Sequence, residues 1–134
     1  DYLENGVSDG ALYLSGSCKH NITIDLNGYS IDRGLENAIT NGYVIYMDTY
    51  GSLTIIDSSE GKTGKITGGN NIEEGGAAKW GGIGGAICVD YGKLYLKGVT
   101  VTGNTATYGG AIYCDDKDDA FVYTKSVTTL GQSR

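Results

Sequence analysis

The sequence contains a short apolar motif that returns at intervals along the chain. Gly84-Gly85-Ala86-Ile87 recurs 25 residues later as Gly109-Gly110-Ala111-Ile112. Segments 10–14 and 41–48 follow the same pattern, in which small residues precede alternating apolar residues. Self-similarity at a period of about 20–50 residues is typical of folds that stack one supersecondary unit upon the next. The motif therefore predicts a repeat protein.

Each copy of the motif is followed by further short strand patterns. Alternation of apolar and polar residues over four or five positions predicts a half-buried strand, and no segment has a convincing helical period. Glycine or Asn-Gly stands between the strands, where a corner needs the positive φ that glycine adopts freely. Second strands are expected at 21–24, 52–55, 93–96 and 120–123, and third strands at 29–31, 65–67 and 100–102.

Three short strands per repeat predict an all-β solenoid of about four rungs, each rung being one turn of the chain. We expect a single domain over residues 1–134, with an N-terminal cap at 1–10, rungs at 11–130 and an insertion loop at 70–83. The chain has 23 glycines but no proline and no strict three-residue period, which excludes collagen. A β-sandwich is the alternative, since regularly spaced short strands suit both folds.

The solenoid hypothesis predicts which side chains stack inside it. Equivalent positions of successive rungs would pair strand upon strand in parallel and bury the same face. The first strands would supply the ladders Leu12, Ile45, Ile87, Ile112 and Leu14, Met47, Val89, Cys114. The second strands would supply the ladders Ile22, Leu53, Leu94, Phe121 and Ile24, Ile55, Leu96, Tyr123.

Several of these segments carry a resemblance to a known class of proteins. Residues 101–106 followed by 108–113 look like the GGAI-type repeat of right-handed parallel β-helix surface proteins. Segments 23–32 and 51–59 resemble rungs in secreted proteins of gut bacteria. The resemblance implies a right-handed parallel β-helix from a bacterium, either secreted or held at the cell surface. It is specific for the fold and says little about function.

Small β-helical modules of this kind also resemble a family of xylan-binding carbohydrate-binding modules. This likeness rests on size, glycine-rich rungs and tyrosine content. It implies a plant polysaccharide as the partner and a glycoside hydrolase domain in the same parent protein.

Charge and cysteine content restrict the function classes. A formal charge of -6 argues against nucleic acid as a partner and weakly against polyanionic ligands, because phosphates select basic surfaces. No apolar run approaches the ~20 residues that span a bilayer, so no membrane partner is expected. Cys18, Cys88 and Cys114 are an odd number without CxxC spacing, so neither a zinc site nor a disulfide framework is predicted.

Aromatic residues are the main candidates for binding. The chain has 11 tyrosines against one tryptophan and one phenylalanine. If the first-strand ladders point inward, a column of residues should point outward, namely Tyr13, Tyr46, Cys88 and Tyr113. On the neighbouring face Tyr95 would point outward, near the corner residues Tyr50 and Tyr91.

Exposed tyrosines on a rigid sheet could stack on sugar rings, with the carboxylates of Asp48 and Asp90 accepting hydrogen bonds from sugar hydroxyls. Alternatively, a tyrosine ladder simply stabilises the sheet by cross-strand contact.

The insertion loop at 70–83 contains Trp80, and the corresponding stretch of the next rung, 104–108, is much shorter. Insertions in a solenoid map to a surface loop, often on the binding face. We therefore expect Trp80 to bind ligand beside the tyrosine column, with a lid over exposed apolar residues as the alternative.

The aspartates give a weaker signal. Asp48, Asp90 and Asp115 occupy equivalent rung positions, and hydrolysis of a glycoside needs two carboxylates at a set separation. The chain nevertheless has one histidine, His20, and lacks the complete acid, base and cation sets of β-helical polysaccharide enzymes. No enzymatic activity is expected. Carboxylates suit a hard cation, so calcium is a candidate ligand, and the predicted metal residues are Asp115, Asp116 and Asp118.

The sequence as a whole favours a secreted, non-catalytic carbohydrate-binding module that binds a neutral plant β-glycan and needs no obligatory cofactor. Xylan is the preferred candidate glycan. Two alternatives remain. One is a β-helical fragment of a bacterial adhesin, and the other is a degenerate polysaccharide lyase or hydrolase.

Overall fold

The computed structural model describes residues 3–4, 7–8, 12–14, 19–72, 82–115 and 120–133. Within these ranges the chain is all-β and forms no helix, hence none with the length and apolarity to cross a bilayer. The strands are β1 (Leu3–Glu4), β2 (Val7–Ser8), β3 (Leu12–Leu14), β4 (Asn21–Asp25), β5 (Ser30–Asp32), β6 (Ile45–Ile56), β7 (Lys65–Thr67), β8 (Asn70–Asn71), β9 (Ile87–Lys97), β10 (Thr100–Ala106), β11 (Ile112–Cys114), β12 (Ala120–Lys125) and β13 (Thr128–Ser133).

The strands pair in two parallel sheets and one small antiparallel hairpin. In the larger sheet the long strands β6 and β9 lie side by side, with β3 and β4 along β6 and with β11 and β12 along β9. The second sheet has the order β5, β7, β10, β13, and β8 also pairs with β10. The hairpin is formed by β1 and β2, within the predicted N-terminal cap.

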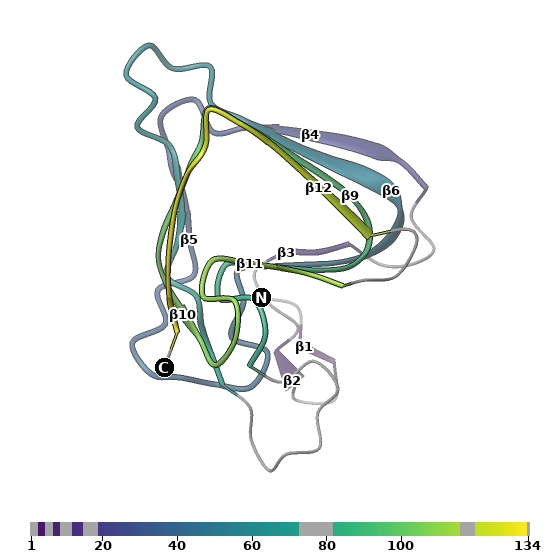
Figure 1. Ribbon diagram of the computed structural model, residues 1–134, viewed down its shortest axis with the longest axis vertical. Helices are drawn as coiled ribbons and strands as arrows, with labels where there is room; N and C mark the ends of the chain where they lie inside the picture. Colours follow the sequence, from purple (N-terminus) through teal and green to yellow (C-terminus); the bar gives the residue numbers. More distant parts are fainter. Residues whose placement is uncertain are drawn as a thin grey trace.

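These sheets form three walls around a shared interior (Figure 1). One wall contains β4, β12 and the second halves of β6 and β9. Another contains β3, β11 and the first halves of β6 and β9, because both long strands bend where their register shifts after Met47. The third wall is the sheet that contains β5 and β10.

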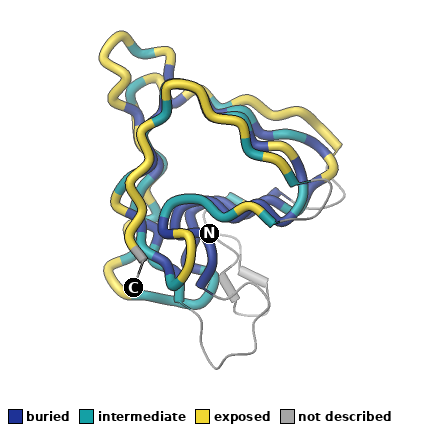
Figure 2. Tube along the Cα trace, in the orientation of Figure 1, coloured by how far each residue is buried: buried dark blue, intermediate teal, exposed yellow. Residues whose placement is uncertain are grey.

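The predicted inward ladders of the first strands are confirmed. Leu12 pairs with Ile45, Ile45 with Ile87, and Ile87 with Ile112. The neighbouring ladder Leu14, Met47, Val89, Cys114 also holds. Except for Cys114, which is exposed, the side chains of these ladders belong to one continuous apolar core together with Leu53, Leu94, Ile55, Leu96, Ile66 and Val101. Figure 2 shows that buried residues dominate the middle strands, whereas β4 is largely exposed.

The paired glycines of the motif have separate roles. Gly84 and Gly109 have φ values of 73° and 62°, and Asn41, one residue further from its strand in the preceding repeat, has a φ of 59°. The second glycine is required by close approach, because a Cβ on Gly85 would lie 2.0 Å from the carbonyl oxygen of Gly110. Glycine thus lets the chain turn and lets successive repeats touch through their backbones.

One predicted register is wrong. Val122, not Phe121, pairs with Leu94, and Tyr123 pairs with Tyr95. Because strand side chains alternate between faces, this one-residue shift reverses the whole strand. Ala120 and Val122 therefore pack against the core, while Phe121 and Tyr123 lie on the outer face with 46% and 43% exposure.

Two buried asparagines hold the corners of the third wall. The Asn104 amide accepts a hydrogen bond from the Gly69 amide and donates to the carbonyl oxygens of Ile66 and Thr102. Asn71 accepts from the Gly42 amide and donates to the Ile83 carbonyl. These side chains satisfy backbone groups that leave the strand ladder at each bend, as buried polar groups must be satisfied.

Candidate functional site

The predicted tyrosine column is formed in register but is not an exposed binding surface. Tyr13 pairs with Tyr46, Tyr46 with Cys88, and Cys88 with Tyr113, all on the outer face of the strands. The expectation that the whole column is exposed is wrong, because Tyr46 is 8% exposed and Cys88 is fully buried. Tyr13 remains 44% exposed and Tyr113 is half-buried.

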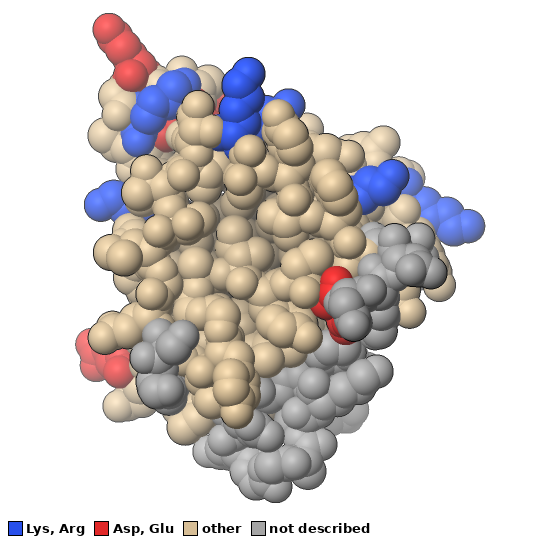
Figure 3. All heavy atoms as spheres, in the orientation of Figure 1, with Lys and Arg blue, Asp and Glu red and all other residues tan. Residues whose placement is uncertain are grey.

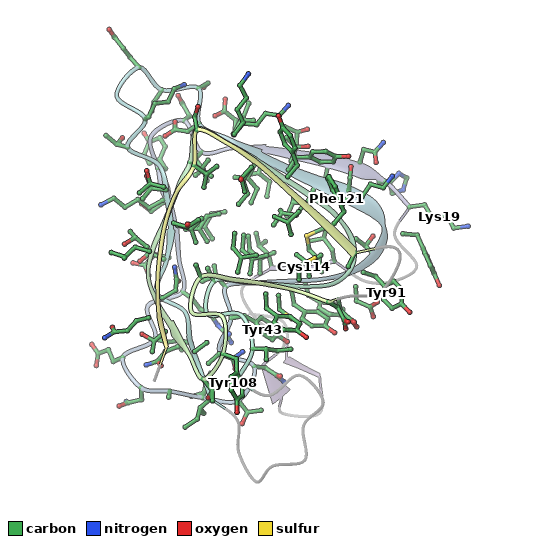
Figure 4. The ribbon with its side chains drawn as sticks, viewed as in Figure 1. Lys19, Tyr43, Tyr91, Tyr108, Cys114 and Phe121 are labelled. Carbon is green, nitrogen blue, oxygen red and sulfur yellow. The ribbon has the colours of Figure 1, made fainter. Side chains whose placement is uncertain are left out.

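A second apolar cluster explains this burial. Tyr43 and Ile83, which precede β6 and β9, pack with Tyr46 and Cys88. The Tyr46 ring stacks on Tyr13 and Tyr43, with ring centroids 5.3 and 5.1 Å away. Figure 4 places Tyr43 outside the wall that contains β11. The column therefore acts mainly by packing, as cross-strand aromatic pairs do.

Burial also sets the chemistry of the column. Desolvation raises the pKa of Tyr46, and the nearby carboxylate of Asp90 adds to the effect. The Tyr46 hydroxyl donates a hydrogen bond to Asp90 Oδ2 over 3.2 Å. Desolvation likewise raises the pKa of the Cys88 thiol to about 12, so this thiol is not a ready nucleophile at neutral pH.

The predicted aspartate ladder is only partly formed. The Asp115 amide donates to the Val89 carbonyl, which puts Asp115 at the level of Asp90. The register shift places Asp48 opposite Tyr91 instead of Asp90. Among the described residues, no three His, Cys, Asp or Glu side chains are grouped so that they could hold a metal ion.

The remaining predicted site residues have separate outcomes. Asp116, Asp118 and Trp80 lie outside the described residues. Tyr91 and Tyr95 are both half-buried on β9, and Tyr95 faces outward as predicted.

Tyr95 belongs to an outer face that the sequence pattern did not reveal. The outward positions in the second half of β9 are Lys93, Tyr95 and Lys97. Directly beside them on β12 are Phe121, Tyr123 and Lys125. We call Tyr95, Phe121 and Tyr123 the aromatic platform.

The rings of the platform are close to one another. The Tyr95 ring centroid is 6.0 Å from that of Phe121 and 6.2 Å from that of Tyr123, at interplanar angles of 55° and 51°. Figure 4 shows Phe121 projecting from β12 away from the interior. The platform is supported from below by Leu94 and Leu96, which are fully buried, so its backbone is held by the core.

Small polar side chains continue this face on the two preceding strands. Thr54 and Thr23 follow Tyr95 in the same ladder, and Ser52 and Asn21 follow Lys93. The Ser52 hydroxyl donates to Asn21 Oδ1 over 2.8 Å. The face therefore combines raised rings on one side with hydroxyl and amide groups on the other.

A hollow lies at each end of the platform. One, of about 190 Å³, is lined by Thr49, Tyr50, Gly51, Gly92 and Lys93. The other, of about 430 Å³, lies where β9 and β12 reach the next corner, and its lining includes Lys62, Lys97 and Lys125. We call these three residues the lysine corner.

Asp57 also lines this second hollow, and its carboxylate is hydrogen-bonded to backbone amides. The carboxylate accepts hydrogen bonds from the amides of Gly28, Ser59 and Gly64 and from the Ser59 hydroxyl. These bonds, chiefly those to Ser59 and Gly64, hold the pKa of Asp57 at about 2. Asp57 is 3% exposed, so its carboxylate is largely shielded from solvent and is bound by these amides and the Ser59 hydroxyl.

The face thus offers a rigid patch of aromatic rings bordered by hydroxyl groups and by lysines. Rings present an apolar surface with polar groups at the edge, the combination required by ligands with both apolar and hydroxylated sides. Comparison with known proteins adds no relative, since no family model, no curated protein and no solved structure matches the chain.

Proposed function

We propose that the chain is a right-handed parallel β-helix that binds a plant cell-wall β-glycan without cleaving it. Xylan is the preferred candidate ligand. The fold proposal is supported by parallel pairing in both large sheets and by the recurrence of three strand positions in successive repeats. The right-handed sense follows from the strong preference of parallel β crossovers for that hand. As in the proteins it resembles, the module would be secreted or displayed by a bacterium beside a glycoside hydrolase domain.

The aromatic platform is the observation that carries the binding proposal. Tyr95, Phe121 and Tyr123 place three aromatic rings, tilted relative to one another, within one small area of a sheet whose other side is the core. A sugar ring could rest its CH groups on these rings while its hydroxyls meet Thr54, Ser52 and the tyrosine hydroxyls. The sheet holds the rings in place, so little conformational entropy is lost on binding.

The outward side chains of this face support binding without catalysis. Glycoside hydrolysis uses a pair of carboxylates that flank the bond to be cleaved. The outward positions of β6, β9 and β12 around the platform are occupied by serine, threonine, isoleucine, lysine and aromatic residues. The proposal requires no cofactor, and a calcium site at Asp115, Asp116 and Asp118 stays a prediction.

Affinity electrophoresis and calorimetry with soluble xylan test the proposal. Tyr95→Ala and Tyr123→Ala should each weaken binding about thirtyfold, the effect of removing an aromatic anchor worth ~2 kcal/mol. Tyr29→Ala is the matched control, because Tyr29 is 76% exposed and lies outside the platform. Thermal melting should show that all three variants fold.

Two results would contradict the proposal. Unchanged xylan binding by Tyr95→Ala and Tyr123→Ala would show that the platform is not the site, and Trp80→Ala would then test the predicted insertion loop. Release of reducing ends or unsaturated uronates from xylan, above a heat-inactivated control, would show that the chain is an enzyme.

A further inference from the structure

We infer that the glycan bound by this face carries carboxylates, as uronic acid side groups, and that the lysine corner binds them. This inference rests on the proposed glycan binding and names the charge of the ligand. It differs from the expectation based on net charge, because a net charge of -6 by itself argues weakly against acidic ligands.

The first observation is the placement of like charges directly opposite each other. Lys97 on β9 and Lys125 on β12 are register partners, and both are exposed. Adjacent strands are only about 4.8 Å apart, and like charges directly opposite each other destabilise a sheet. An anion between the two ammonium groups would relieve this repulsion.

The second observation is that a third lysine is held at the same place. Lys62 donates from Nζ to the Asp57 carbonyl oxygen over 2.5 Å. Its stem lies over the corner after β9, because a Cβ on Gly98 would meet Lys62 Cδ at 3.8 Å. Gly98 itself has a φ of 66°, so this corner favours glycine and leaves room for the lysine stem.

The third observation is that, although the exposed Glu60 lies in the same corner, no carboxylate within the described residues is paired with these lysines. Asp57 is buried against backbone amides, and Asp25 accepts hydrogen bonds from the amides of Asn27 and Ser58. Figure 3 shows several Lys and Arg side chains along the upper margin of the molecule, with acidic side chains beside them.

The position of the lysine corner relative to the platform selects the class of ligand. Lys97 and Lys125 come two residues after Tyr95 and Tyr123 on the same face, a separation of about 6.6 Å along each strand. A ligand on the rings that extends into the 430 Å³ hollow would bring an acidic group to the lysines. A pyranose chain with uronate side groups has this combination, and lysine suits a carboxylate as a point charge.

Single-stranded nucleic acid also combines stacking with negative charge, so the test must separate it from a glycan. The overall negative charge disfavours nucleic acid, because binding to a polyphosphate depends on a summed field from many cations.

The experiment compares glucuronoxylan with the same polymer after its carboxyl groups have been reduced to hydroxyls. At about 0.05 M salt the parent should bind the acidic polymer about three- to tenfold more tightly than the reduced polymer, and at about 0.5 M salt the difference should shrink. Lys97→Gln/Lys125→Gln should lose the preference and keep the affinity for the reduced polymer. Lys65→Gln is the control, since Lys65 is exposed on β7 in the third wall.

Each other outcome is decisive. Equal binding of both polymers by the parent, or a preference that survives in the double lysine variant, would overturn the inference and leave the proposed function standing. Absence of binding to either polymer would overturn both. Tighter binding to a single-stranded oligodeoxythymidylate than to glucuronoxylan would overturn the inference in favour of nucleic acid.

Discussion

Asp57 illustrates how one carboxylate can hold a corner that lacks regular strand pairing. Its Oδ1 accepts from Gly28, which belongs to the preceding repeat, and from Ser59 in its own turn, while its Oδ2 accepts from Gly64. The side chain therefore joins three segments whose amides have left the sheet. Each of these bonds is stronger with an ionised acceptor.

The ionisation of Asp57 predicts a loss of stability in acid. Its folded pKa of about 2 lies below the ordinary value of 3.8 for an aspartate. Its contribution is thus fully present above about pH 4 and is lost as the pH falls through about 2. The melting temperature of the parent should decrease between about pH 5 and about pH 2 more steeply than that of Asp57→Asn, which has no proton to gain there. Asp25, whose pKa is also lowered by bonds to Ser58 and Asn27, should keep part of the acid sensitivity in the variant.

Glu60→Gln provides the control for this measurement, because Glu60 is exposed in the same corner. If Asp57→Asn and Glu60→Gln have the same pH profile as the parent, the hydrogen bonds to Asp57 do not contribute to stability.

At the residue scale, the sequence could predict to which face of a strand a side chain points, but not how exposed that side chain is. The alternating pattern correctly placed Tyr46 outside the main core. It could not show that Tyr43 and Ile83, from two separate loops, would cover the Tyr46 ring. Burial by residues outside the strand is a tertiary effect that leaves no local periodicity. The same limit applies to Asn71 and Asn104, whose burial depends on backbone groups of other repeats.

At the scale of elements, β12 is the strand for which pattern alone was insufficient. The first four residues of β12 are all apolar or aromatic, namely Ala120, Phe121, Val122 and Tyr123. Either the even-numbered or the odd-numbered positions could therefore face the core. The larger residues suggested the wrong choice. Val122 and Thr124 pair with Leu94 and Leu96, and Val122 packs against the core while Thr124 is exposed. The aromatic residues are left to build the platform. For β9 and β11, by contrast, the Gly-Gly-Ala-Ile motif correctly predicted the register, with Ile112 opposite Ile87.

The register of β12 can be tested by introducing a charge on each face. Val122→Asp should reduce the free energy of unfolding by about 2 kcal/mol or more, because the side chain packs against the core. Phe121→Asp should cost clearly less, since this position is 46% exposed. Chemical denaturation of both variants gives the comparison. A larger loss for Phe121→Asp would support the register expected from the sequence alone.

At the scale of the whole molecule, stability should vary with position in the stack. Parallel strands pair in series from β3 through β6 and β9 to β11, so the middle strands are covered by neighbours on both sides. The consequence is visible in one ladder, where Ile45 and Ile87 are fully buried while Leu12 and Ile112 are half-buried. In a stacked architecture each unit is stabilised mainly by its nearest neighbours. A core substitution should therefore cost most in the middle.

Ile87→Ala and Ile112→Ala test this gradient with the same chemical change in the same ladder. Ile87 lies between Ile45 and Ile112, and its loss leaves a cavity lined on two sides, at a cost of about 2–5 kcal/mol. Ile112 already contacts solvent, so its truncation removes less apolar surface and should cost about 1–2 kcal/mol. Urea titrations of the 134-residue chain measure both values. Equal losses would mean that the chain unfolds with no difference between middle and outer repeats, and that Ile112 is covered as fully as Ile87.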